Sequence, residues 1–202
     1  MHQGERFSFY SHLLGLALAL IAACWMLLEV SRASDAARVL AAAVFALTVI
    51  AVYASSSIFH GARGQAKEFW KRLDHCSIYL LIAGTFTPFS LNLPVGFLVA
   101  IWVLSIFGIS LELSREKCLP PALWPYVVTG WVAVIGALQS LDTLYSNVSG
   151  FLFCGALCYS AGLFFYRNKA GHKYSHGIWH LFVLAGTTFH YAAVSRYLIQ
   201  GN

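Results

Sequence analysis

Residues 174–182, YSHGIWHLF, stand at the start of the last long apolar stretch of the chain, which continues to residue 198. A stretch of about 20 apolar residues is long enough to cross a membrane as a helix. It begins with His176 and His180, which are four residues apart and therefore lie on one face of that helix, one turn apart. This stretch raises two questions: which fold the chain adopts, and what function two imidazoles have on one face of a membrane-spanning helix.

The composition shows which solvent the chain is built for. Of its 202 residues, 59% are hydrophobic and only 10% are charged, whereas soluble domains carry about 25% charged residues. A soluble domain is therefore excluded, and the sequence predicts an integral membrane protein. The formal net charge of +5 does not indicate nucleic-acid binding, because the basic residues form short clusters between apolar stretches.

Apolar stretches of membrane-spanning length recur along the whole chain. The sequence predicts an all-α fold, a bundle of seven transmembrane helices, with spans at 9–29, 39–60, 74–92, 95–113, 124–141, 149–166 and 176–198. Pro88 falls inside the third span and predicts a kink there. Because the loops are short, residues 1–202 are expected to form a single domain with no soluble part.

The lysine and arginine residues predict how the bundle is oriented. If the N-terminus lies in the cytoplasm, the cytoplasmic loops hold ten of these residues and the outer loops hold three. This asymmetry predicts a cytoplasmic N-terminus and a C-terminus outside.

Ionisable residues gather at one depth in this arrangement. His60 ends the second span, Asp74 begins the third, and His176 and His180 begin the seventh, all on the cytoplasmic side. Ser56 lies one helical turn before His60, on the same face. Three histidines that leave a fourth position for water are typical of a catalytic zinc site. The sequence therefore predicts Zn²⁺ bound by the three histidines in the inner leaflet.

The chemistry of such a site follows from its neighbours. Asp74 is placed to accept a proton from water or to orient a histidine ligand, and Ser56 is placed to hydrogen-bond to the water or to Asp74. At this depth the expected substrate is a membrane lipid that is cleaved at an ester or amide bond near its headgroup.

Each of these residues also has a simpler interpretation. Asp74 is at a position where an aspartate could cap a helix. Ser56, between two further serines, could hold two helices together. A histidine such as His60 could lie at the membrane interface, and imidazole nitrogens accept several divalent ions besides zinc.

Other polar residues near the spans are assigned to packing. His12 is expected to lie beneath the site without being a ligand, and His75 is expected at the membrane interface. Glu112 is three residues from Arg115 and predicts a local ion pair. His190 follows His176 by 14 residues, the spacing of two haem ligands on one helix, but no other histidine is predicted at its depth.

Three motifs carry a resemblance to a known family that extends over nearly the whole chain. Residues 56–60 (SSIFH), 72–88 (RLDHCSIYLLIAGTFTP) and 176–194 (HGIWHLFVLAGTTFHYAAV) resemble the hemolysin III family. That family is the bacterial branch of the progestin and adipoQ receptor (PAQR) proteins, within the broader CREST group of membrane hydrolases. The matching residues are Ser56, His60, Asp74, His176 and His180, in the family's order and spacing.

The resemblance implies seven transmembrane helices, a cytoplasmic N-terminus and a zinc ion held by the three histidines. It also implies that Asp74 and Ser56 handle the water, and relatives that are ceramidases suggest hydrolysis of a lipid amide. The long N-terminal region of the adiponectin receptors is missing, which favours the bacterial branch and a bacterial inner membrane. Two alternatives remain: a receptor or membrane-state sensor with a structural zinc, and a pore-forming cytolysin.

Overall fold

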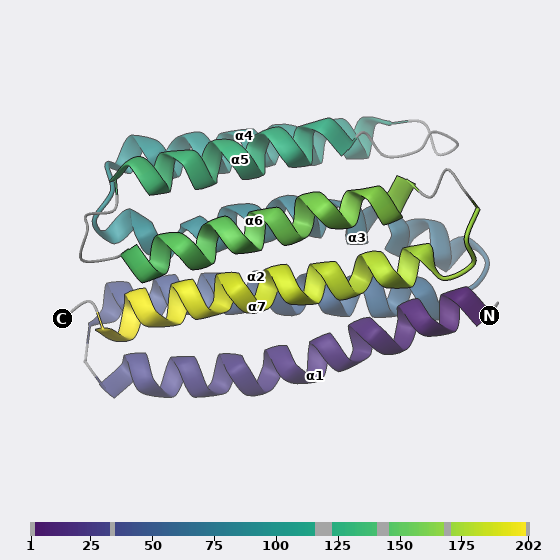
Figure 1. The fold of residues 1–202 in the computed structure, drawn as a ribbon, viewed down its shortest axis with the longest axis horizontal. Helices are drawn as coiled ribbons and strands as arrows, with labels where there is room; N and C mark the ends of the chain where they lie inside the picture. Colours follow the sequence, from purple (N-terminus) through teal and green to yellow (C-terminus); the bar gives the residue numbers. More distant parts are fainter. Residues whose placement is uncertain (1–2, 33–34, 116–122, 141–145, 168–170, 201–202) are drawn as a thin grey trace.

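The computed structural model describes residues 3–32, 35–115, 123–140, 146–167 and 171–200. These residues form long helices that lie side by side, with the two chain termini at opposite ends of the bundle (Figure 1). The α-helices are α1 (Gln3–Arg32), α2 (Ala36–Gly61), α3 (Gln65–Phe86), α4 (Val95–Ser114), α5 (Leu123–Ser140), α6 (Ser146–Arg167) and α7 (Ser175–Gln200). Each predicted span is thus matched by a helix, and the predicted seven-helix bundle is confirmed.

Length and composition suit these helices to a bilayer. Four stretches in the described part are long and apolar enough to cross a membrane: Gly4–Arg32, Ala36–Gly61, Val95–Ser114 and Asn147–Arg167. The outer surface also carries large apolar side chains that are mostly exposed, such as Ile21, Val95 and Phe164. An apolar surface of this kind faces lipid rather than water.

The third span differs from its prediction at both ends. The helix α3 begins at Gln65, nine residues before the predicted start, and ends at Phe86. A short 3₁₀-helix, η1 (Pro88–Leu91), follows it, so Pro88 ends the helix instead of kinking it. The reason is that proline has no backbone N–H for the next helical hydrogen bond, although Thr87 before it still has helical φ and ψ angles of −57° and −44°.

Packing around α2 brings distant parts of the chain to one end of the bundle. The helix α2 contacts α1 on one side and α3 on the other, and α7 contacts both α6 and α1. Gly64 starts the turn back into α3 with a φ of 60°, a conformation that glycine adopts without steric cost. We call the end of the bundle where α2 ends and α7 begins the histidine end.

Side chains fix the register of these helices. Ser55 Oγ of α2 lies 3.1 Å from Ser77 Oγ of α3. Deeper in the bundle, large buried side chains fill the core between the helices, among them Met26, Phe45, Phe86 and Phe89. The histidine end is therefore positioned by helices that are packed along their length.

Candidate metal centre

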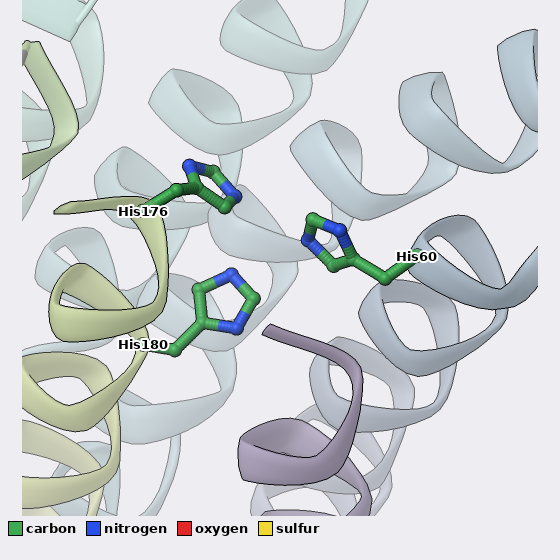
Figure 2. A group of neighbouring side chains, drawn as sticks. All are labelled: His60, His176 and His180. Atoms are coloured by element: carbon green, nitrogen blue, oxygen red, sulfur yellow. The ribbon is translucent and has the colours of Figure 1, made fainter. Parts of the chain in front are cut away.

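Three histidines meet at the histidine end. His60 lies in the last turn of α2, and His176 and His180 lie in the first two turns of α7. Their rings point toward one another across the gap between the two helices (Figure 2). One ring nitrogen from each lies within 4.8 Å of those from the other two. Three histidines arranged in this way could hold one metal ion.

The hydrogen bonding of His60 fits a bound cation. Its side chain is buried, and neither Nδ1 nor Nε2 has a hydrogen-bond partner among the described residues. A buried polar atom without a partner is costly, and a cation held between the three rings would satisfy the one nitrogen of His60 that carries a lone pair. Neutral imidazoles are also the donors that zinc and other transition metals accept.

The helix α1 orients His180. Its Nδ1 lies 3.0 Å from the backbone carbonyl oxygen of Ser8 and 3.3 Å from Ser11 Oγ. Because a carbonyl oxygen can only accept, Nδ1 carries the hydrogen, and Nε2 is left with a lone pair for a metal. Ser8 and Ser11 were missed by the sequence reasoning, because nothing in their spacing says which helix they face.

His12 packs directly on the histidine cluster. Its ring is stacked on that of His180 with 3.6 Å between the ring centroids, and the edge of Tyr53 contacts it. His12 is buried, and neither of its ring nitrogens is hydrogen-bonded within the described part of the chain. It lies outside the group of three candidate ligands, as the sequence analysis expected.

Asp74 and Ser56 line one cavity together with His176 and His180. Asp74 lies well inside α3, whose N-cap is Gly64, so the helix-cap interpretation of Asp74 is wrong. Ser56 Oγ is buried without a hydrogen bond of good geometry, although it lies close enough to the Asp74 carboxylate to interact with it. The hydrogen bond of good geometry between α2 and α3 is made by Ser55, with Ser77.

The cavity continues from the histidines into the bundle between apolar walls. Its lining includes aliphatic and aromatic side chains of α3, α5, α6 and α7, among them Ile82, Trp131, Leu163 and Val183, and it reaches His190. Asp74 is its only lining carboxylate among the described residues. A polar end is thus joined to a long apolar interior.

Two other histidines, His75 and His190, have partners that the sequence did not predict. His75 is not interfacial but buried, and its Nδ1 lies 2.8 Å from Glu112 Oε1. Glu112 also makes the predicted contact with Arg115, at 4.0 Å. His190 Nε2 donates to the Leu152 carbonyl oxygen, 3.1 Å away. Because Nε2 makes this hydrogen bond, the structure gives no support to His190 as a haem ligand.

Comparisons with known proteins agree on one group. The family described as Haemolysin-III related matches residues 2–191. Hemolysin-3 of Bacillus cereus is 31% identical over 94% of this chain and 89% of its own length. The Hemolysin-3 homolog of Bacillus subtilis is 30% identical over 94% of this chain and 92% of its own length. The human monocyte to macrophage differentiation factor is 28% identical over 78% of this chain and 70% of its own length.

Proposed function

This chain belongs to the haemolysin-III-related family of membrane proteins, and we propose that it is a zinc-dependent hydrolase that cleaves an amide or ester bond in a membrane lipid. One observation carries the proposal. One ring nitrogen each from His60, His176 and His180 lie within 4.8 Å of one another, and those of His60 have no hydrogen-bond partner among the described residues. His176 and His180 of this group line a cavity together with Asp74 and Ser56.

The donor set favours zinc with an open position. The described residues supply three imidazoles to the group and no fourth ligand from a carboxylate or a thiolate. Structural zinc sites are usually closed by four protein ligands, whereas catalytic sites keep one position for water or substrate. When bound there, zinc supplies a Lewis acid and makes water acidic enough to act as a nucleophile near neutral pH.

The residues of the cavity supply the remaining functions. Asp74 would accept a proton from the attacking water and pass it to the leaving group, the task of a general base and acid. Ser56 would hold the Asp74 carboxylate or the water through its hydroxyl. The Ser8 carbonyl would keep His180 in the tautomer that leaves Nε2 free.

The shape of the cavity supports a lipid as the substrate. From His176 to His190 it follows α7 for 14 residues, which corresponds to about 21 Å of helix. The hydrocarbon of one leaflet is about 15 Å thick, so the apolar part can hold one acyl chain while the scissile carbonyl lies at the histidines. The clusters of basic residues favour the cytoplasmic leaflet for this end, and the relatives from Bacillus favour a bacterial inner membrane.

The test combines metal content with turnover. Protein purified in detergent without chelator is analysed for metals and then assayed against ceramides, lysolipids and acyl esters. We expect about one zinc per chain, product release that stops when a chelator removes the metal, and recovery when zinc is returned. Asp74→Asn should keep the metal and lose turnover.

Other outcomes point to the alternatives. Zinc at full occupancy with no product from any substrate class would reject the hydrolase and favour a receptor or sensor with a structural metal. Conductance of liposomes that depends on the protein would favour a cytolysin. Absence of any bound metal would reject the metal centre itself.

A further inference from the structure

The end of the cavity farthest from the histidines is polar as well. His190 of α7 lines it together with Tyr159 of α6 and Thr85 of α3. Thr85 lies 11 residues along α3 from Asp74, which corresponds to about 16 Å of helix. This deep polar end has no part in the proposed hydrolysis, and burying polar groups in the middle of a bundle requires partners for them.

His190 presents only an acceptor to a ligand. Its side chain is 6% exposed, and the rings of Phe86 and Tyr159 contact it with centroid distances of 6.3 and 5.4 Å. Nε2 carries the hydrogen, because it donates to the carbonyl oxygen of Leu152. A neutral imidazole has one N–H, so Nδ1 is left as an acceptor, and no described residue hydrogen-bonds to it. Gly155 makes room for this ring, since a methyl group there would overlap it.

The hydroxyl groups of Tyr159 and Thr85, which line the cavity together with His190, have also used their hydrogens. Thr187 Oγ1 donates to the Val183 carbonyl oxygen at 2.9 Å. Tyr159 Oη lies 2.9 Å from Thr187 Oγ1 and must therefore be the donor of that pair. Thr85 Oγ1 donates to the Leu81 carbonyl oxygen at 2.7 Å. The His190 nitrogen and the Tyr159 and Thr85 oxygens are thus left to accept hydrogen bonds.

We propose that the deep end of the cavity is a binding site for a hydroxyl group at the far end of a long-chain ligand whose polar head lies at the histidines. A set of acceptors needs a donor, which excludes a carboxylate or a ketone. An ammonium group is disfavoured, because the cavity's carboxylate, Asp74, lies at the other end and an unpaired charge in the membrane interior is costly. A hydroxyl is a neutral group that donates one hydrogen bond, which one of these acceptors can receive.

The proposal concerns binding and goes beyond the proposed hydrolysis, so it can be tested with ligands that are not cleaved. Equilibrium binding to the purified protein is compared for 16-hydroxyhexadecanoate and hexadecanoate. We expect the hydroxylated chain to bind about 3- to 10-fold more tightly, the range of one additional net hydrogen bond. Loss of hydrolase activity would not affect this comparison.

Two substitutions show whether the preference arises at the deep end. His190→Phe and Thr85→Val should reduce the affinity ratio of the two chains, His190→Phe to about one, while hexadecanoate binds as before. Thr188→Val is the matched control, because Thr188 also donates to the carbonyl oxygen four residues earlier but is exposed and lies outside this cavity. If His190→Phe fails to fold, Thr85→Val decides the question.

Three results would overturn the proposal. The first is equal affinity for the two chains in the unmodified protein, which would mean that a trapped water satisfies the acceptors better than a ligand does. The second is a preference that survives both substitutions. The third is failure of either chain to bind at all.

Discussion

Two groups of buried or half-buried histidines lie near the histidine end, and they differ in their partners. His75 faces a carboxylate, with its Nδ1 2.8 Å from Glu112 Oε1. His60, His176 and His180 face one another, and the two nitrogens of His60 have no partner in the described residues. His75 already has a partner in the protein, whereas the three-histidine group would be satisfied by a bound cation. His12 is buried and without a hydrogen-bond partner among the described residues as well, but it lies outside the ligand group. A metal site is therefore indicated by several unpartnered imidazoles that converge, and not by the burial of a single one.

The largest expected effect comes from removing one member of the cluster. His180→Ala should lower the zinc content from about one ion per chain to near zero, because two imidazoles hold zinc far more weakly than three. Elemental mass spectrometry of the purified protein measures this. His172→Ala, an exposed histidine close to the start of α7, should leave the metal content unchanged. Equal metal content in the two variants would show that His180 is not a metal ligand.

The second prediction separates chemistry from metal binding. Asp74→Asn should lower the rate of lipid hydrolysis by about 10²- to 10⁴-fold, the usual contribution of a general base, with the metal still bound. Turnover and metal content are measured on the same preparation. Asp35→Asn is the control, because Asp35 caps α2 at the other end of the bundle and asparagine can also cap. Loss of metal in Asp74→Asn would show that Asp74 acts on the site in another way.

The third prediction concerns the orientation of a ligand. Ser11→Ala removes the hydroxyl 3.3 Å from His180 Nδ1, and we expect the affinity for zinc to fall by about 10-fold, as for other groups that orient a histidine ligand. Competition with a zinc-binding dye measures the affinity. Ser31→Ala is the matched control, because Ser11 and Ser31 both donate to the carbonyl oxygen three residues earlier on α1, but Ser31 is exposed. An unchanged affinity in Ser11→Ala would leave the Ser8 carbonyl as the group that orients His180.

The smallest effect is expected at the pair of His75 and Glu112. Glu112→Gln weakens the buried contact with His75 and should lower the free energy of unfolding by about 1–3 kcal/mol, which lowers the thermal midpoint by several degrees. The metal content should not change. Glu29 forms an exposed ion pair with Arg32, three residues along the chain, which is the spacing of Glu112 and Arg115. Glu29→Gln should therefore lower the free energy of unfolding by less than about 1 kcal/mol. Loss of metal in Glu112→Gln would mean that the two histidine groups are coupled.

Much of the fold could be predicted from the sequence, because a membrane helix needs a long apolar stretch and such stretches recur along the chain, four of them of full spanning length within the described residues. The helix ends were harder to predict. The charged first turns of α3, residues 65–73, were left out of the third span, since a search for apolar stretches stops at charges although a helix does not. Pro88 was expected to bend α3, whereas the structure ends α3 at Phe86 and continues with a 3₁₀-helix.

The candidate site, like the fold, was predicted only in part. His60, His176 and His180 were expected to meet because the spans place them at one depth, and the structure brings their nitrogens together. The roles assigned to Asp74 and Ser56 stay predictions, although both line the cavity beside the histidines. His75 was misplaced because its partner, Glu112, comes from another helix, 37 positions away in the chain.

The sequence by itself determined the membrane environment, the number of helices and the depth of the polar residues, because these depend on hydrophobicity and charge along one chain direction. Only the tertiary structure decided which polar groups face each other. Ser8 against His180, Glu112 against His75 and Leu152 against His190 are contacts between different helices. A helix fixes the face on which a side chain lies, but the rotation and packing of its neighbours decide what that face meets.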